Sequence, residues 1–130
     1  LAKLLEENGN DSGARILYKE IIELDFMNKD AYTALIKYYE EKKVIAAICA
    51  APSVFGKLGF LNGRVATCYP GFEKDLQGAI VCPTKVAVDE NVVTAKGMGA
   101  AIDFALKLIE LLIGLETAAE ISDAIIYRQY

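Results

Sequence analysis

Cys49 is the residue of this chain that is best placed for covalent chemistry. It ends the apolar run 44–48, which predicts a strand buried on both faces, as in the middle of a parallel sheet. Small residues and Pro52 follow, which is typical of the start of a helix. The thiol is therefore expected on a tight strand-to-helix turn, where free backbone N–H groups and the helix dipole favour a thiolate. Because the thiolate is the nucleophilic form, this pattern predicts thiol chemistry.

Few side chains in the sequence could assist that thiol. The chain has no histidine, so neither Cys-His nor Ser-His-Asp catalysis is available within it, and no metal site or cofactor is expected. Glu40 and Glu41 precede the strand and lie roughly 15 Å from Cys49 at about 3.3 Å per residue, so we interpret them as solvated charges. Cys68 could approach Cys49 if its strand is the neighbouring one, and Cys82 is expected to be structural. The alternative for Cys49 is a buried structural thiol.

Composition restricts the class of protein. The 130 residues are 54% hydrophobic and 25% charged, which suits a globular protein with a real core. The net charge of −4 gives no reason to expect nucleic acid or an anionic membrane as a partner. No apolar run approaches the roughly 20 residues that span a bilayer, and residues 1–7 do not resemble a signal peptide. Three scattered cysteines suggest reduced thiols in a cytoplasmic protein.

Residues 44–130 have the pattern of an α/β protein that would position Cys49. Strands are predicted at 44–48, 64–68, 79–82, 85–88 and 92–95, with a hairpin turn at 89–91. Short helical segments are predicted around 53–58 and 72–76. Gly97-Met98-Gly99 opens a long helix through Ile113, followed by a last helix around 117–124. The apolar positions of the long helix are expected in the core: Ile102, Phe104, Ala105, Leu108, Ile109 and Leu112.

Residues 1–43 are predicted to be helical. Asp11-Ser12 and Asn28 are expected to cap two helices, the first with Ala14, Leu17 and Leu24 on one apolar face. This segment resembles a tetratricopeptide repeat, because Leu1 and Leu35, like Leu5 and Tyr39, lie one 34-residue period apart. An ordinary helical hairpin with the same spacing is the alternative. The tyrosines of this segment are expected to pack between helices.

The second segment resembles the ThiJ/PfpI family of the class I glutamine amidotransferase-like superfamily. The similarity lies in VIAAICAAPSVFGKLGFLNGR around Cys49, in VATCYPGFEKDL, and in KVAVDENVVTAKGMGAAIDFALKLIELL. It implies a flavodoxin-like sandwich in which Cys49 is the nucleophile and the N–H of Ala50 contributes to an oxyanion hole. Tyr69 lies near the position where some members carry a histidine. The resemblance also implies glyoxalase- or deglycase-type action on small carbonyl compounds, or redox sensing, in a homo-oligomer.

One part of that family pattern is not recognisable. The family's first strands, its glycine-rich loop and the glutamate that hydrogen-bonds the cysteine have no counterpart in residues 1–43. We therefore expect a partial sandwich preceded by an α-helical hairpin, with impaired activity. A junction near residue 43 is compatible with a chimera, a designed sequence or a fragment. The alternative function is a non-catalytic scaffold or interaction protein.

Overall fold

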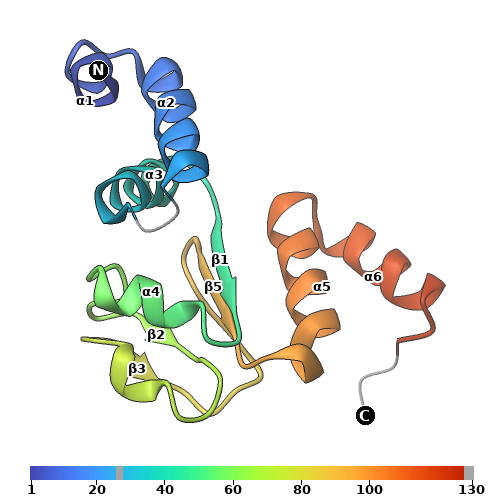
Figure 1. Ribbon diagram of the computed structural model, residues 1–130. Coiled ribbons are helices and arrows are strands. Elements are labelled where there is room, and N and C mark those ends of the chain that lie inside the picture. Colours follow the sequence, from blue (N-terminus) through green and yellow to red (C-terminus); the bar gives the residue numbers. More distant parts are fainter. Residues whose placement is uncertain (26–27, 128–130) are drawn as a thin grey trace. The chain divides into compact units, whose positions relative to one another are not determined.

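The computed structural model describes residues 1–25 and 28–127, without the side chains of Asp11 and of residues 38–42 (Figure 1). The predictions for Tyr39, Glu40 and Glu41 therefore lie outside the described side chains. The chain forms two compact units, Leu1–Lys43 and Val44–Tyr130. Each unit is described by itself below. Within the described residues, no helix combines the length and the apolar character needed to cross a membrane.

The first unit contains three helices, α1 (Ala2–Glu7), α2 (Asp11–Leu24) and α3 (Lys29–Lys42). The cap of α2 is Asn10, whose side chain accepts from the N–H of Gly13, so the predicted Asp11-Ser12 cap was one residue late. Asn28 caps α3 as expected, because its side chain accepts from the N–H of Ala31. Three small residues form the buried contacts between helices: Ala2, Ala14 and Ala31. Leu24 was expected on the apolar face but is 90% exposed, since it ends α2.

The second unit is built on short strands. β1 (Ile45–Ile48) pairs in parallel with β5 (Val92–Ala95), and β5 pairs antiparallel with β4 (Val86–Asp89), which confirms the predicted hairpin. β2 (Val65–Ala66) and β3 (Ile80–Val81) form a second, parallel pair. Both are shorter than predicted. The N–H of Thr67 donates to the side chain of Thr94 instead of continuing the ladder, and Pro83 has no N–H to offer.

β5 lies between β1 and β4 and contacts α5, and its four residues are all buried. α4 (Pro52–Lys57) follows β1, and the 3₁₀ turn η1 (Glu73–Asp75) follows β2. The predicted long helix begins as a 3₁₀ turn, η2 (Met98–Ala100), and continues as α5 (Ala101–Leu112) before α6 (Leu115–Ala124). The α/β class with helices preceding a partial sheet is as expected.

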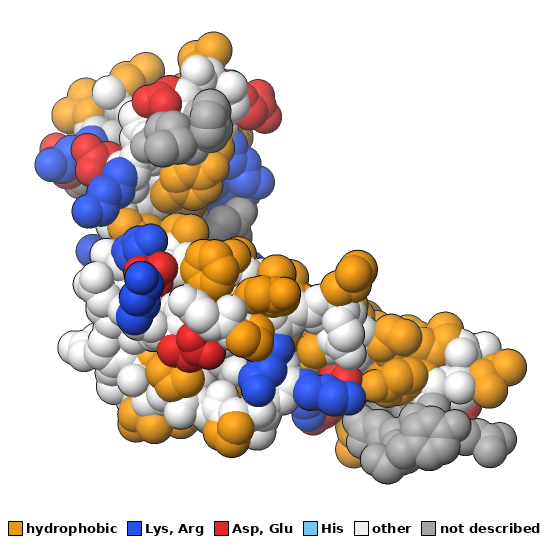
Figure 2. All heavy atoms as spheres, turned by 60° about the horizontal axis from the view of Figure 1, so that its bottom comes forward, with side chains coloured by type: hydrophobic (Ala, Val, Ile, Leu, Met, Phe, Trp, Pro, Cys, Tyr) orange, Lys and Arg blue, Asp and Glu red, His pale blue; other side chains and the backbone are white. Residues whose placement is uncertain are grey.

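The predicted core of α5 needs a correction. None of its residues is fully buried, and Ile102 and Leu112 are 46% and 64% exposed. α5 packs against β5 and α6, so only part of its apolar surface finds a partner among the described residues. Figure 2 shows the resulting hydrophobic surface at the α5–α6 end of this unit.

Candidate active site

Cys49 occupies a left-handed backbone conformation at the turn between β1 and α4. Its φ of 66° is unusual for a residue other than glycine. Two hydrogen bonds hold this turn: the N–H of Cys49 donates to the carbonyl of Ala95 over 2.9 Å, and its carbonyl accepts from the N–H of Tyr69 over 2.8 Å. Hydrogen bonds of both its N–H and its carbonyl thus hold Cys49 in this rare conformation, as expected where the surrounding structure imposes it. The thiol is half-buried.

The N–H of Ala50 is available beside this thiol. Ala51 and Ser53 donate to the carbonyls of Ile48 and Ala50, and Pro52 has no N–H. Among residues 1–25 and 28–127, no hydrogen bond from the N–H of Ala50 is formed. A backbone donor without an acceptor next to a nucleophile has the chemistry of one half of an oxyanion hole.

Gly97 lies where the Cys49 thiol and the Tyr69 ring approach each other. A methyl group on Gly97 would lie 3.9 Å from Sγ of Cys49 and 3.3 Å from Cδ2 of Tyr69. Glycine at this buried position therefore lets the tyrosine ring and the sulfur approach the same point. The sequence indicated Gly97 only as a turn before a helix, since nothing in its spacing shows what it faces.

The helix that follows the thiol is seated by a second close approach. A Cβ on Gly56 would lie 2.2 Å from the carbonyl oxygen of Asp75 and 2.5 Å from Cα of Leu76. Only a residue without a side chain allows α4 to pack this closely on η1 and the residues after it. Pro52 and Ser53, at the start of α4, are buried as well. The turn that carries Cys49 is therefore followed by a helix that is packed at both ends.

Cys49 lies at the edge of the sheet where several parallel strands end. β1 and β5 are parallel, as are β2 and β3. β2 also runs in the direction of β5, because Thr67 meets Thr94 and, further along both chains, Tyr69 meets Gly97. Open α/β sheets bind ligands at this carboxyl edge. The sheet topology therefore places Cys49 where ligands are usually found.

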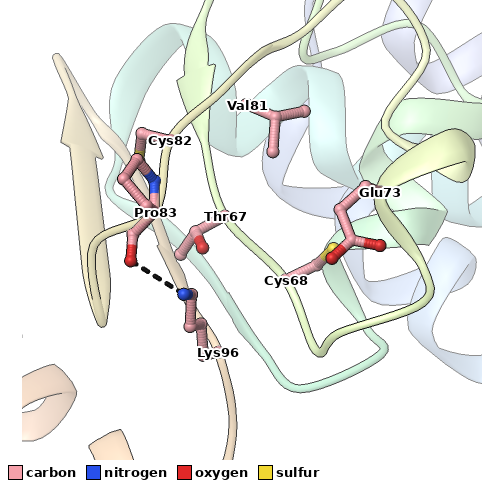
Figure 3. A pocket seen from close by; sticks show the side chains of 7 residues that line it. All are labelled: Thr67, Cys68, Glu73, Val81, Cys82, Pro83 and Lys96. Carbon is pink, nitrogen blue, oxygen red and sulfur yellow. Dashed lines mark hydrogen bonds between the residues drawn. The ribbon is translucent and has the colours of Figure 1, made fainter.

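A cavity of about 300 Å³ opens at the same edge. It is lined by residues at or just after the ends of β2, β3 and β5, together with Glu73 of η1 (Figure 3): Thr67, Cys68, Glu73, Val81, Cys82, Pro83 and Lys96. Lys96 donates from Nζ to the carbonyl of Pro83 over 2.7 Å. Cys82 shares a hydrogen bond with the hydroxyl of Thr84. The sequence did not predict this cavity, because its lining comes from four separate segments.

Cys68 has a different environment from Cys49. Its side chain is 2% exposed, and burial raises the pKa of its thiol, with smaller contributions from the nearby carboxylates Glu73 and Asp75. Lys96 acts in the opposite direction on this pKa, but the result is a raised value. Cys68 is thus held as a neutral thiol. The next residue, Tyr69, donates its N–H to the carbonyl of Cys49, so the two cysteines lie in neighbouring segments.

The described part of the chain supplies no acid partner for Cys49. No carboxylate hydrogen-bonds its thiol within residues 1–25 and 28–127, and the side chains of Glu40 and Glu41 lie outside the description. No group of three or more possible metal ligands occurs among the described residues. The structure brings together Cys49, Ala50 and Tyr69, the three residues singled out in the sequence.

Comparison with known proteins identifies the family. Residues 25–111 match the DJ-1/PfpI family over more than half of the chain. The chain belongs to the DJ-1/PfpI family. Its fold is similar to that of the solved structure of oxidized DJ-1 from Toxoplasma gondii, with a TM-score of 0.70 and 39% identity over 76% of this chain and 55% of that one.

Two curated relatives show the extent of the similarity. DJ-1 homolog B of Arabidopsis thaliana is 41% identical over 85 residues, which are 64% of this chain and 19% of that protein. Glutathione-independent glyoxalase DJR-1.2 of Caenorhabditis elegans is 38% identical over 74 residues, 56% of this chain and 40% of that protein. The chain thus spans less than half the length of either relative. The family match begins before α3, earlier than the predicted boundary at residue 44. The tetratricopeptide and chimera interpretations of residues 1–43 stay predictions.

Proposed function

We propose that Cys49 is the nucleophile of a DJ-1/PfpI-type site that reacts with small carbonyl compounds, in the manner of a glyoxalase or deglycase. The observation that carries this proposal is the left-handed turn at Cys49, which directs a half-buried thiol toward Gly97 and Tyr69. The name of the C. elegans relative, a glyoxalase, supports the same class of substrate.

The first chemical step follows from the groups at the turn. The Cys49 sulfur would add to the aldehyde carbon, forming a C–S bond while the carbonyl electron pair moves to oxygen. The N–H of Ala50 is a donor for that developing oxyanion, which then takes a proton to give a hemithioacetal. No atom leaves in this addition, so the step is reversible. The Tyr69 side chain and the Cys49 sulfur approach the same point above Gly97, and we propose that this side chain orients the aldehyde.

Later steps require a proton acceptor, and we propose that they are slow in this chain. The reason is that no carboxylate of the described residues bonds to the Cys49 thiol. The same thiol is also a candidate for oxidation by a hydroperoxide, in which sulfur takes the terminal oxygen to give a sulfenic acid and the corresponding alcohol or water is released. A description of the T. gondii relative as oxidized is in line with this second reactivity.

Incubation with methylglyoxal tests the proposal. We expect a reversible mass increase of one methylglyoxal on the peptide that contains Cys49, with slow loss of substrate, both abolished in Cys49→Ser. Cys82→Ser serves as the matched control and is expected to behave as the wild type. If Cys49→Ser consumes methylglyoxal as fast as the wild type, the reactive site lies elsewhere and the non-catalytic scaffold becomes the better interpretation.

We also propose that the protein self-associates. Leu112, Ile113 and Leu115, at the junction of α5 and α6, are each more than 60% exposed, as is Ile126. Contiguous apolar surface of this kind is typical of an interface. Light scattering should give a mass above that of one chain, and replacement of Leu112 and Ile113 by Asp should reduce it to the monomer value. A monomeric wild type would contradict this proposal.

A further inference from the structure

We propose that Tyr69 and Phe72 form an aryl-binding wall that selects, for reaction at Cys49, electrophiles that carry a flat apolar group. This inference rests on the proposed reactivity of Cys49 and adds a substrate class to it, namely aromatic 2-oxoaldehydes in preference to small alkyl ones. Four observations on the described residues carry it: the position of the rings, their rigidity, their exposure, and the engagement of nearby charges elsewhere.

The position of Tyr69 brings an aromatic ring to the nucleophile. The ring and Sγ of Cys49 both lie within 4 Å of the point above Gly97 where a side chain would begin. Phe72 packs against the Tyr69 ring. The two ring centroids are 6.5 Å apart and the planes are inclined at 73°, an edge-to-face pair of the kind that aromatic side chains prefer.

Backbone hydrogen bonds fix the wall relative to the sulfur. The N–H of Tyr69 donates to the carbonyl of Cys49, and the N–H of Phe72 donates to the carbonyl of Tyr69. The N–H of Gly71 donates to Oε2 of Glu73 over 2.7 Å, which closes the loop between the two rings. A wall fixed in this way loses little conformational freedom when it binds a ligand.

The rings are exposed although they are aromatic. Tyr69 is 49% and Phe72 38% exposed, so a substantial part of each residue is accessible to a ligand. Two charged residues of the neighbouring cavity are engaged in hydrogen bonds of their own: Glu73 accepts from the N–H of Gly71, and Lys96 donates to the carbonyl of Pro83. The two rings beside the sulfur therefore form an aromatic corner, because their planes are inclined at 73°. A third ring can stack on one of them and meet the other edge-on, whereas a methyl group gains little from such contact.

Two maleimides test this wall without any need for turnover. In both reagents the sulfur adds to the same double bond and a neighbouring carbon takes a proton, but N-phenylmaleimide carries a ring and N-ethylmaleimide does not. The rate of modification at Cys49 is measured for each reagent by mass spectrometry of the peptide that contains this residue. The ratio of the two rates is then divided by the same ratio for glutathione, which removes the intrinsic reactivity of the reagents.

In the wild type we expect the normalised phenyl-to-ethyl rate ratio to lie between about 3 and 10. This is the range of rate enhancement that the free energy of an aromatic contact provides. Phe72→Ala should lower it by at least half, while Phe72→Tyr, which keeps the ring, should preserve it. Ile80→Ala is the matched control, because Ile80 is an exposed apolar residue of the same unit, and this variant should leave the ratio unchanged. Thermal melting of each variant shows that it is folded.

The outcomes separate this inference from the proposed function. A wild-type ratio of one, or a ratio that Phe72→Ala does not change, overturns the aryl-binding wall while the reactivity of Cys49 stands. Failure of Cys49 to react with either maleimide, under conditions in which Cys82 does react, overturns both. With phenylglyoxal and methylglyoxal as substrates, the same order of preference is expected for the wild type, and a preference for methylglyoxal would contradict it.

Discussion

Cys49 and Cys68 both follow the end of a parallel strand, at the same edge of the sheet, yet their environments are opposite. Cys49 lies in a left-handed turn with a half-buried thiol that faces Gly97 and Tyr69. Cys68 is fully buried in the wall of a cavity, where burial and the carboxylates Glu73 and Asp75 raise the pKa of its thiol. One hydrogen bond, from Tyr69 N–H to the Cys49 carbonyl, ties the two regions together.

A place at the carboxyl edge of the sheet does not by itself make a thiol reactive. Parallel strands bring both cysteines to the edge where ligands bind. The backbone then separates them, because Cys49 lies on a left-handed turn and stays partly exposed, whereas Cys68 is buried. Local charge completes the separation, since neighbouring carboxylates disfavour a thiolate.

The largest effect on both cysteine environments is expected when α4, which follows Cys49, is displaced from the loop that follows Cys68. Gly56→Ala would place a methyl carbon 2.2 Å from the backbone oxygen of Asp75, and backbone cannot yield as a side chain does. We expect about 3 kcal/mol of lost stability, measured by urea unfolding. Gly99→Ala is the control, because nothing lies within 4 Å of its added methyl group. Equal stability of the two variants would show that α4 can shift freely.

A direct measure of the comparison is the labelling of the two thiols in one sample. At pH 7.5 we expect iodoacetamide to modify Cys49 at least about tenfold faster than Cys68, since access and thiolate fraction both control the rate. Peptide mass spectrometry gives both rates at once. In Cys49→Ser the residual labelling should fall mainly on Cys82, which is partly exposed. Faster labelling of Cys68 than of Cys49 would reverse the assignment of the reactive thiol.

The raised pKa of Cys68 predicts how stability depends on pH. In the folded state this thiol keeps its proton to a higher pH than in the unfolded state, where the pKa is about 8.5. The unfolded state therefore binds fewer protons above that pH, and the free energy of unfolding should fall as the pH rises from about 8.5 toward 9.5. Cys68→Ser should reduce this slope. The free energy of unfolding is measured only below the ordinary tyrosine pKa of about 10, because Tyr18 and Tyr127 also have raised pKa values and would contribute to the slope above it.

A smaller effect would show how much the carboxylate of Glu73 contributes to the raised pKa of Cys68. Glu73→Gln removes the carboxylate that contributes most, after burial, to the raised pKa of Cys68. The pH at which Cys68 becomes reactive toward iodoacetamide should shift downward. Burial alone would account for Cys68 if the variant left its pH profile unchanged. Lys74→Gln, on the same turn, is the control for a change of surface charge.

Several elements followed from the sequence because their signals are local. The apolar run before Cys49, the hairpin at residues 89–91 and the Asn28 cap each depend on a few consecutive residues, and all three are present. The likeness of segments 44–64, 65–76 and 85–112 to the ThiJ/PfpI pattern was also sufficient to indicate the family. Helical spacing, in contrast, misplaced Ile102 and Leu112 in the core. A periodic apolar face shows that a helix could be buried, but not whether another element covers it.

Local patterns in the sequence indicated where a nucleophilic cysteine could lie, which strand leads into it and which family the chain resembles. The surroundings of that cysteine, with Tyr69 and Gly97 beside the sulfur and a separate cavity for Cys68, are set by the fold. Tyr69 and Gly97 are 20 and 48 positions from Cys49 in the chain, and they meet it because pairing fixes the order and direction of the strands. Strand ends become neighbours through sheet topology, and no short spacing in the chain records that proximity.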